Sequence, residues 1–252
     1  MSTVEPRSHL AAYSADEIAA IVALRCQELS DHLGWSVAPP AVRVLGPSEL
    51  RDAAEADVQR RSEAIRGRPR EEGLLAELAS WLLGFFGPSL LGYFGTSQNT
   101  LFLNGELGTS QAGYVLMHEL VHAAQWQRFP GLFARIDAGR VAAEDLADQQ
   151  GEQGHEAQVA RDHYEALVTF LEGHATFHAR RACESRLRRN LPDASDEEIR
   201  AFVEALMGLD LTDETTTLIY VRGEALHTSL EPAQVEAMFR EPDEIVRRLS
   251  RR

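Results

Sequence analysis

Residues 115–125 form an apolar stretch with helical spacing that carries two histidines and a glutamate. Side chains four positions apart share one face of a helix, so His118 and His122 can reach a single ion. Glu119 lies roughly 100° round the helix from His118, which places its carboxyl beside that ion rather than on it. The alternative is a structural core helix whose histidines bond to carbonyl groups. Because two imidazoles and a carboxylate are costly in an apolar core without a partner, the pattern favours a buried metal site.

A catalytic zinc takes three protein ligands and leaves the fourth position to water, so a third ligand is expected further along the chain. A metzincin motif would require glycine at position 125 and histidine at position 128, where the chain has Gln125 and Arg128. The metzincin class is therefore excluded. In a second arrangement of catalytic zinc, the third ligand is a glutamate from a later helix. Helical spacing over residues 155–189 offers Glu165 and Glu172 as candidates.

These two glutamates compete for the position of the third ligand. Glu165 and Glu172 are seven residues apart, so they lie within about 20° of each other on one helical face. The residues that follow Glu172 include three small ones, Gly173, Ala175 and Thr176. We expect them to let this helix approach the histidine-bearing helix closely. Close approach favours Glu172 as the ligand and leaves Glu165 behind it or facing solvent.

The two motifs resemble those of the zincin metallopeptidases, specifically the gluzincin-like bacterial group with His-Glu-x-x-His-Ala-x-Gln and a distant Glu-Gly-x-Ala. The resemblance extends over residues 91–249, and only its first two motifs are specific. The chain departs from the group in having His174 where aspartate is commoner and Ala124 where leucine is commoner. The first departure changes which side chains can support the ligands. The matching segments are residues 118–125 and 172–175, and more loosely 91–104, 220–223 and 239–242.

The resemblance implies a zinc-dependent hydrolase of peptide bonds, with a peptide or protein as its substrate. Zn2+ held by His118, His122 and Glu172 would lower the pKa of its bound water towards about 7. Glu119 would take the proton as that water attacks and would then protonate the leaving amine. The alternative is a non-catalytic zincin-fold module that binds a peptide or partner, with a structural metal or none. Glu119 favours the enzyme, because a module that only binds does not require this carboxylate.

Hydrolysis would also require a donor, besides zinc, for the oxyanion that develops on the substrate. The candidates are Tyr220, His227, His174 and His178, and we favour Tyr220. His174 and His178 are four residues apart, which is compatible with a second metal site. No carboxylate or cysteine accompanies them at ligand spacing, so helix-surface or interface imidazoles are the preferred interpretation. The resemblance further implies that the strand at residues 100–103 binds extended substrate by backbone pairing.

Residues 1–252 are expected to form one domain, because no repeat, low-complexity tract or long linker interrupts them. Residues 1–90 would be an N-terminal helical part and 91–252 the catalytic part. The predicted fold class is α+β and predominantly helical, and the resemblance makes it zincin-like, with a small hairpin before the active-site helix. The β-branched residues 215–221 are compatible with a strand, and only the resemblance favours a helix there. The predicted elements are helices at 14–32, 49–66, 74–83, 111–127 and 155–189, a strand at 42–45, a hairpin at 91–94 and 100–103, and later helices that begin after Ser195 and near Pro232 and Pro242.

All 25 basic residues are arginines, which excludes Schiff-base enzymes, P-loop nucleotide binding and kinases. The 39 acidic residues give a formal net charge of −14, so neither nucleic acid nor an anionic membrane is expected as a partner. Residues 1–13 lack the apolar segment of a signal peptide, and the two cysteines suit a reducing compartment, so a cytoplasmic location is expected. Arginine pairs such as residues 60–61 are typical of solvated helix faces. The oligomeric state stays open.

Overall fold

The computed structural model describes residues 9–67, 90–151, 153–207 and 214–249. Helices dominate these residues and three strands form a sheet, so the prediction of a mainly helical α+β chain is confirmed. The predicted core helix at 74–83 lies outside the described residues. In chain order the elements are η1 (Leu10–Ala12), α1 (Ala15–Leu33), β1 (Ala41–Leu45), α2 (Pro47–Arg66), β2 (Gly92–Gly95), β3 (Thr100–Asn104), α4 (Thr109–Arg128), α5 (Pro130–Gln150), α6 (His155–Asn190), α7 (Asp196–Met207), α8 (Glu214–Thr228), α9 (Pro232–Arg240) and α10 (Pro242–Leu249).

Local sequence accounts for the ends of the first two long helices. Ser14 and Glu17 form the predicted capping box of α1, in which each side chain accepts a hydrogen bond from the other residue's backbone amide. Gly34 ends α1 in the left-handed conformation, at φ 67°, and Gly67 ends α2 in the same way. α2 begins at Pro47, earlier than predicted, because proline suits the first turn of a helix.

β3 is the central strand of the sheet, whose order is β1-β3-β2. It pairs antiparallel with β2, as the predicted hairpin requires, and parallel with β1, with Ala41 opposite Thr100. Every residue of β3 is buried. A strand with partners on both sides has no free edge, so the prediction that residues 100–103 pair with substrate is wrong. Among the described strands, β2 is the edge strand of the hairpin.

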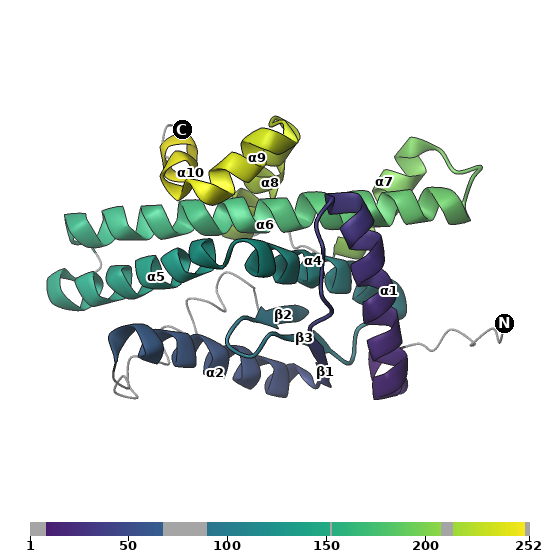
Figure 1. Cartoon of the computed structure of the whole chain (residues 1–252), viewed down its shortest axis with the longest axis horizontal. Coiled ribbons are helices and arrows are strands. Elements are labelled where there is room, and N and C mark those ends of the chain that lie inside the picture. Colours follow the sequence, from purple (N-terminus) through teal and green to yellow (C-terminus); the bar gives the residue numbers. More distant parts are fainter. Residues whose placement is uncertain (1–8, 68–89, 152, 208–213, 250–252) are drawn as a thin grey trace.

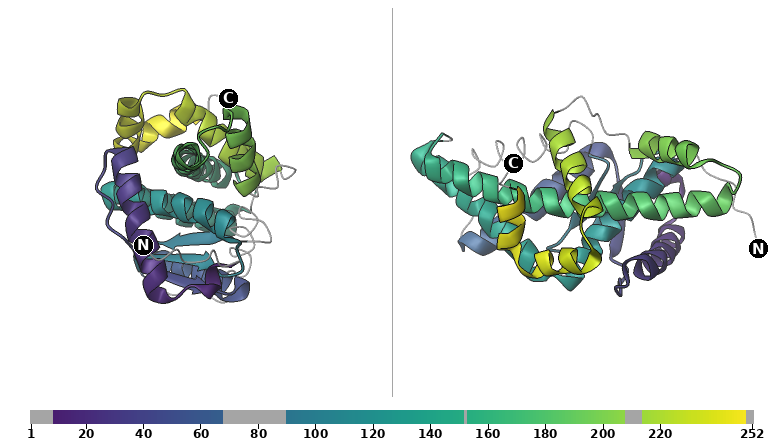
Figure 2. Two further views of the ribbon diagram at one scale, coloured as in Figure 1. Left: turned by 90° about the vertical axis from the view of Figure 1, so that its right-hand side faces the viewer. Right: turned by 90° about the horizontal axis from the view of Figure 1, so that it is seen from above.

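α6 is the axis of the helical part of the molecule (Figure 1). α4 and α5 lie along one side of it, and the sheet lies between α4 and α2 (Figures 1 and 2). α9 and α10 pack on another side of α6, and α8 crosses it. α8 is helical, as the resemblance indicated, whereas α5 was not predicted. No helix in the described part of the chain has both the length and the hydropathy needed to cross a membrane.

α6 and α8 cross at two glycines, Gly173 and Gly223. A Cβ atom on Gly173 would lie 2.1 Å from the Gly223 carbonyl carbon, and one on Gly223 would lie 2.3 Å from the Thr169 carbonyl oxygen. Neither position has room for a side chain, so the two backbones are in contact. The expectation that Gly173 brings α6 towards α4 is therefore wrong. Ala175, in the core cluster that α4 and α6 share, and Thr176, beside Tyr114 of α4, are the small residues on that side.

Replacing Gly223 by alanine is expected to destabilise the fold by about 1–3 kcal/mol, because the added methyl group overpacks the crossing. Gly131→Ala in α5 is the matched control, since a Cβ there meets nothing within 4 Å and alanine is the better helix former. Urea unfolding of both variants measures the difference in free energy. Equal stability of the two variants would contradict the close crossing of α6 and α8.

Candidate metal centre

Helices α4 and α6 bring His118, His122 and Glu172 together in the core. α4 is buried around most of its circumference because most of its residues are apolar, and His122 and Glu172 are each only 9% exposed. The Nε2 atoms of His118 and His122 are 3.1 Å apart. The Oε2 atom of Glu172 lies 3.1 Å from His118 Nε2 and 3.4 Å from His122 Nε2. Over the described residues, this is the one group of three or more histidine, cysteine or acidic side chains placed to hold a metal ion.

The spacing of these three atoms suits a tetrahedral metal ion. Ligand atoms about 2.0–2.2 Å from zinc, at tetrahedral angles, are roughly 3.3–3.6 Å from one another. The observed separations of 3.1 and 3.4 Å are close to that range. Two imidazole nitrogens and one carboxylate oxygen are also a donor set of catalytic zinc sites, which keep a fourth position open. The group could therefore hold a divalent metal ion.

A buried amide supports one of these ligands. His122 Nδ1 donates a hydrogen bond to Gln125 Oε1 at 2.8 Å. Gln125 Nε2 lies 3.1 Å from the Leu171 carbonyl oxygen and 3.0 Å from His174 Nδ1. A hydrogen bond from Nδ1 leaves the lone pair of Nε2 for a metal, which is the usual arrangement around a ligand histidine.

Charge pairing shifts the pKa values of two of the candidate ligands in opposite directions. Burial raises the pKa of Glu172, but His122 and His118 outweigh this effect and hold that pKa well below its usual range. Burial lowers the pKa of His122, but the Glu172 carboxylate outweighs this effect and raises that pKa to about 9. A histidine must lose its proton to bind a metal, so an incoming ion would displace this proton.

Glu119 lies beside the three ligands, where β2 passes over α4. A Cβ on Gly92 would lie 2.6 Å from Val115 Cγ1 and 3.0 Å from Glu119 Cγ, so the absence of a side chain lets β2 approach this closely. Burial raises the pKa of Glu119 and outweighs the lowering effect of His122 and His118. A buried carboxyl with a raised pKa next to a metal position suits a general base.

Tyr220 of α8 lies beside a ligand, with its ring centroid 6.1 Å from that of His118. Burial and the nearby Glu172 carboxylate raise the pKa of Tyr220 well above its usual range. The phenol therefore keeps its proton at neutral pH and can donate a hydrogen bond. Of the four predicted oxyanion donors, Tyr220 is the one that the fold brings next to the histidine pair.

The other three predicted donors have different surroundings. His227 Nε2 donates a hydrogen bond to the Phe170 carbonyl oxygen at 2.9 Å. His178 Nδ1 is 3.1 Å from His32 Nε2, so this ring faces α1. His174 is only 1% exposed, which makes the helix-surface interpretation wrong for this residue. Burial lowers its pKa well below the usual value, and His178 lowers it further.

The competing carboxylate, Glu165, lies outside the group of ligands. Burial and Asp162 raise the pKa of Glu165, and Arg161 lowers it. The fold thus brings Glu172, and not Glu165, to the histidine pair.

A network of charged and polar groups anchors β2, and no sequence motif predicts it. Asp57 is fully buried and accepts hydrogen bonds from the Tyr93 hydroxyl at 2.7 Å and from Arg61 Nε at 3.0 Å. Arg61 also bonds to the Tyr93 hydroxyl at 2.8 Å and to Asp137 of α5. Arg61 was predicted to lie on a solvated helix face, which is wrong. Because Tyr93 follows Gly92, the network fixes the strand where it meets Glu119.

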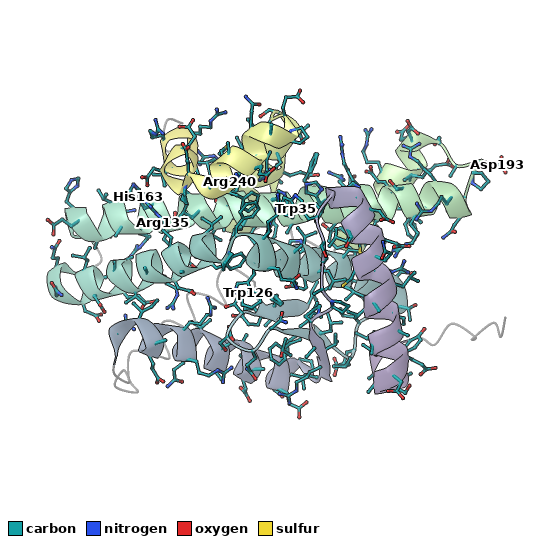
Figure 3. The ribbon with its side chains drawn as sticks, in the orientation of Figure 1. Trp35, Trp126, Arg135, His163, Asp193 and Arg240 are labelled. Atoms are coloured by element: carbon teal, nitrogen blue, oxygen red, sulfur yellow. The ribbon has the colours of Figure 1, made fainter. Side chains whose placement is uncertain are left out.

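Two tryptophans, Trp35 and Trp126, pack neighbouring segments against α4 and α6 (Figure 3). Trp35, which follows α1, stacks on His174 with ring centroids 5.6 Å apart. Trp126, near the end of α4, contacts Phe94 of β2 edge-on at 5.9 Å. These large apolar rings pack the segments before β1 and in β2 against the helices that carry the ligands.

No protein-family model matches this chain, and no curated protein matches it. A solved structure from Chloroflexus aurantiacus, described as a "putative hydrolase with a novel fold", is similar to it. The alignment covers 96% of this chain and 91% of that one, at 18% identity and a TM-score of 0.43. At this level of similarity the activity of that protein does not transfer to this chain.

Proposed function

We propose that this chain is a zinc-dependent metallopeptidase of the gluzincin-like kind, which hydrolyses peptide bonds. One observation carries the proposal: the ligand atoms of His118, His122 and Glu172 lie 3.1–3.4 Å apart, and the buried carboxyl of Glu119 is beside them. The donor set of two imidazoles and one carboxylate is one that zinc takes in hydrolytic enzymes. Zinc bound there would lower the pKa of a water molecule and polarise a substrate carbonyl.

Glu119 would act first as a base and then as an acid. Its carboxylate would take a proton from the attacking water, and a raised pKa makes it a stronger base than an exposed glutamate. The same carboxyl would then pass the proton to the leaving amine nitrogen. Tyr220 would donate a hydrogen bond to the substrate carbonyl oxygen as negative charge develops on it.

The position of β2 supports a peptide as the substrate. β2 is an edge strand, and no other strand of the described residues pairs with its outer side. Gly92 brings its backbone against Glu119. An extended peptide that added a strand to β2 would therefore run next to the proposed base.

Elemental analysis and a peptide hydrolysis assay test the proposed function. We expect about one zinc ion per chain, and hydrolysis that stops when a chelator removes zinc and returns when zinc is added. A folded chain that binds no metal would favour the non-catalytic peptide-binding module. So would a zinc-bound chain that cleaves no member of a diverse peptide library.

A further inference from the structure

We propose that Gln125 is a positioning residue that selects the tautomer of His122 and joins the two ligand helices. The inference rests on the proposed function in assuming that a metal binds between His118, His122 and Glu172. Gln125 lies on α4 one turn after His122, and its side chain is fully buried. Its amide makes contacts with His122 on its own helix and with two residues of α6.

The Leu171 carbonyl oxygen determines the orientation of the Gln125 side-chain amide, that is, which positions its nitrogen and its oxygen occupy. A backbone carbonyl accepts hydrogen bonds and cannot donate them, so the amide atom 3.1 Å from it must be the nitrogen. The amide oxygen then faces His122 Nδ1 at 2.8 Å, and this ring nitrogen must carry the hydrogen. Neutral His122 therefore presents the lone pair of Nε2 to the metal position. A main-chain atom of α6 thus selects the tautomer of a ligand on α4.

His174 accepts the second hydrogen of the amide. Its Nδ1 atom lies 3.0 Å from Gln125 Nε2. The His174 ring is held in place by Trp35, which stacks on it with an interplanar angle of 9°. Leu171 and His174 lie on either side of Glu172 in the sequence. The amide therefore contacts α6 at two points next to the third ligand, so one side chain sets the orientation of His122 and the distance of Glu172 from it.

Gln125→Met tests the inference, because methionine has a similar length and suits a buried site but forms none of the three hydrogen bonds. Competition with a chromophoric chelator measures the zinc affinity of the wild type and the variant. We expect the affinity of Gln125→Met to be about 10–100-fold lower. An unchanged affinity in a folded variant would overturn the inference. Failure of the wild-type protein itself to bind zinc would instead refute the proposed function, so the two failures are distinguishable.

Two variants of His174 keep the inference testable if Gln125→Met does not fold. His174→Asn retains an acceptor in the position of Nδ1, whereas His174→Phe removes the acceptor but keeps a ring against Trp35. We expect the phenylalanine variant to bind zinc roughly 3–10-fold more weakly than wild type, and the asparagine variant to match wild type within about twofold. Melting temperatures of the metal-free proteins control for loss of folding. Equal zinc affinities of both variants would overturn the inference.

Discussion

Glu119→Gln is expected to lower kcat/KM for peptide hydrolysis by about 10²–10⁴-fold, the range typical of losing a general acid–base group. Glutamine keeps the shape of the side chain but cannot take a proton from water. Zinc should remain bound at the wild-type stoichiometry, because Glu119 is not one of the three residues whose ligand atoms converge. Hydrolysis rates and elemental analysis of the same preparations measure both effects.

The same substitution should not weaken the fold, which separates a catalytic role from a structural one. Because burial raises the pKa of Glu119, the native state binds more protons than the unfolded state between the ordinary glutamate pKa and the raised native pKa. In that pH range the carboxyl lowers stability as pH rises. Glutamine has no charge to bury, so the metal-free variant should be at least as stable as wild type at neutral pH. Wild-type rates in the variant would refute the assigned base, and loss of zinc would make Glu119 a ligand.

The sequence predicts that His118, His122 and Glu172 come together because helical periodicity is a local property. The four-residue spacing of His118 and His122 places both rings on one face before any tertiary contact is known. The phase of the later helix then restricts the third member to the face shared by Glu165 and Glu172. The small side chains of Ala175 and Thr176, unlike Gly173, lie on the side of α4. Capping boxes such as Ser14 with Glu17 are local in the same sense, and the ends of α1, α2, α4 and α6 lie within a few residues of the predicted ones.

The partners of each helix face are set by long-range contacts, and there the predictions failed. Helical periodicity places Gly173 on one face of α6. It does not show that α8, rather than α4, packs against that face. The sequence around Arg61 is that of a solvent-exposed helix face. Its partner Asp137 is 76 residues away, so local sequence does not reveal the contact. The pairing of β1 with β3 likewise joins segments that flank all of α2. Only the packed chain shows these contacts.

Glu172→Ala is expected to weaken zinc binding by more than about 100-fold. Zinc sites bind with about 10–16 kcal/mol from four ligands, so one ligand contributes roughly 3 kcal/mol, and each 1.4 kcal/mol is about tenfold in affinity. Glu165→Ala is the matched control, since it removes the same side chain from the same face of α6. It should leave zinc affinity within about twofold of wild type, because Glu165 lies outside the group of ligands. Chelator competition measures both affinities.

If Glu165→Ala weakened zinc binding more than Glu172→Ala, Glu165 would be the third ligand. α6 would have to move about two turns, or roughly 11 Å, along α4 to bring Glu165 to the histidines. Such a shift would also separate Gly173 from Gly223, so Gly223→Ala would no longer overpack the crossing with α8. Zinc affinity and unfolding free energy therefore test the register of α6 independently, the first against α4 and the second against α8.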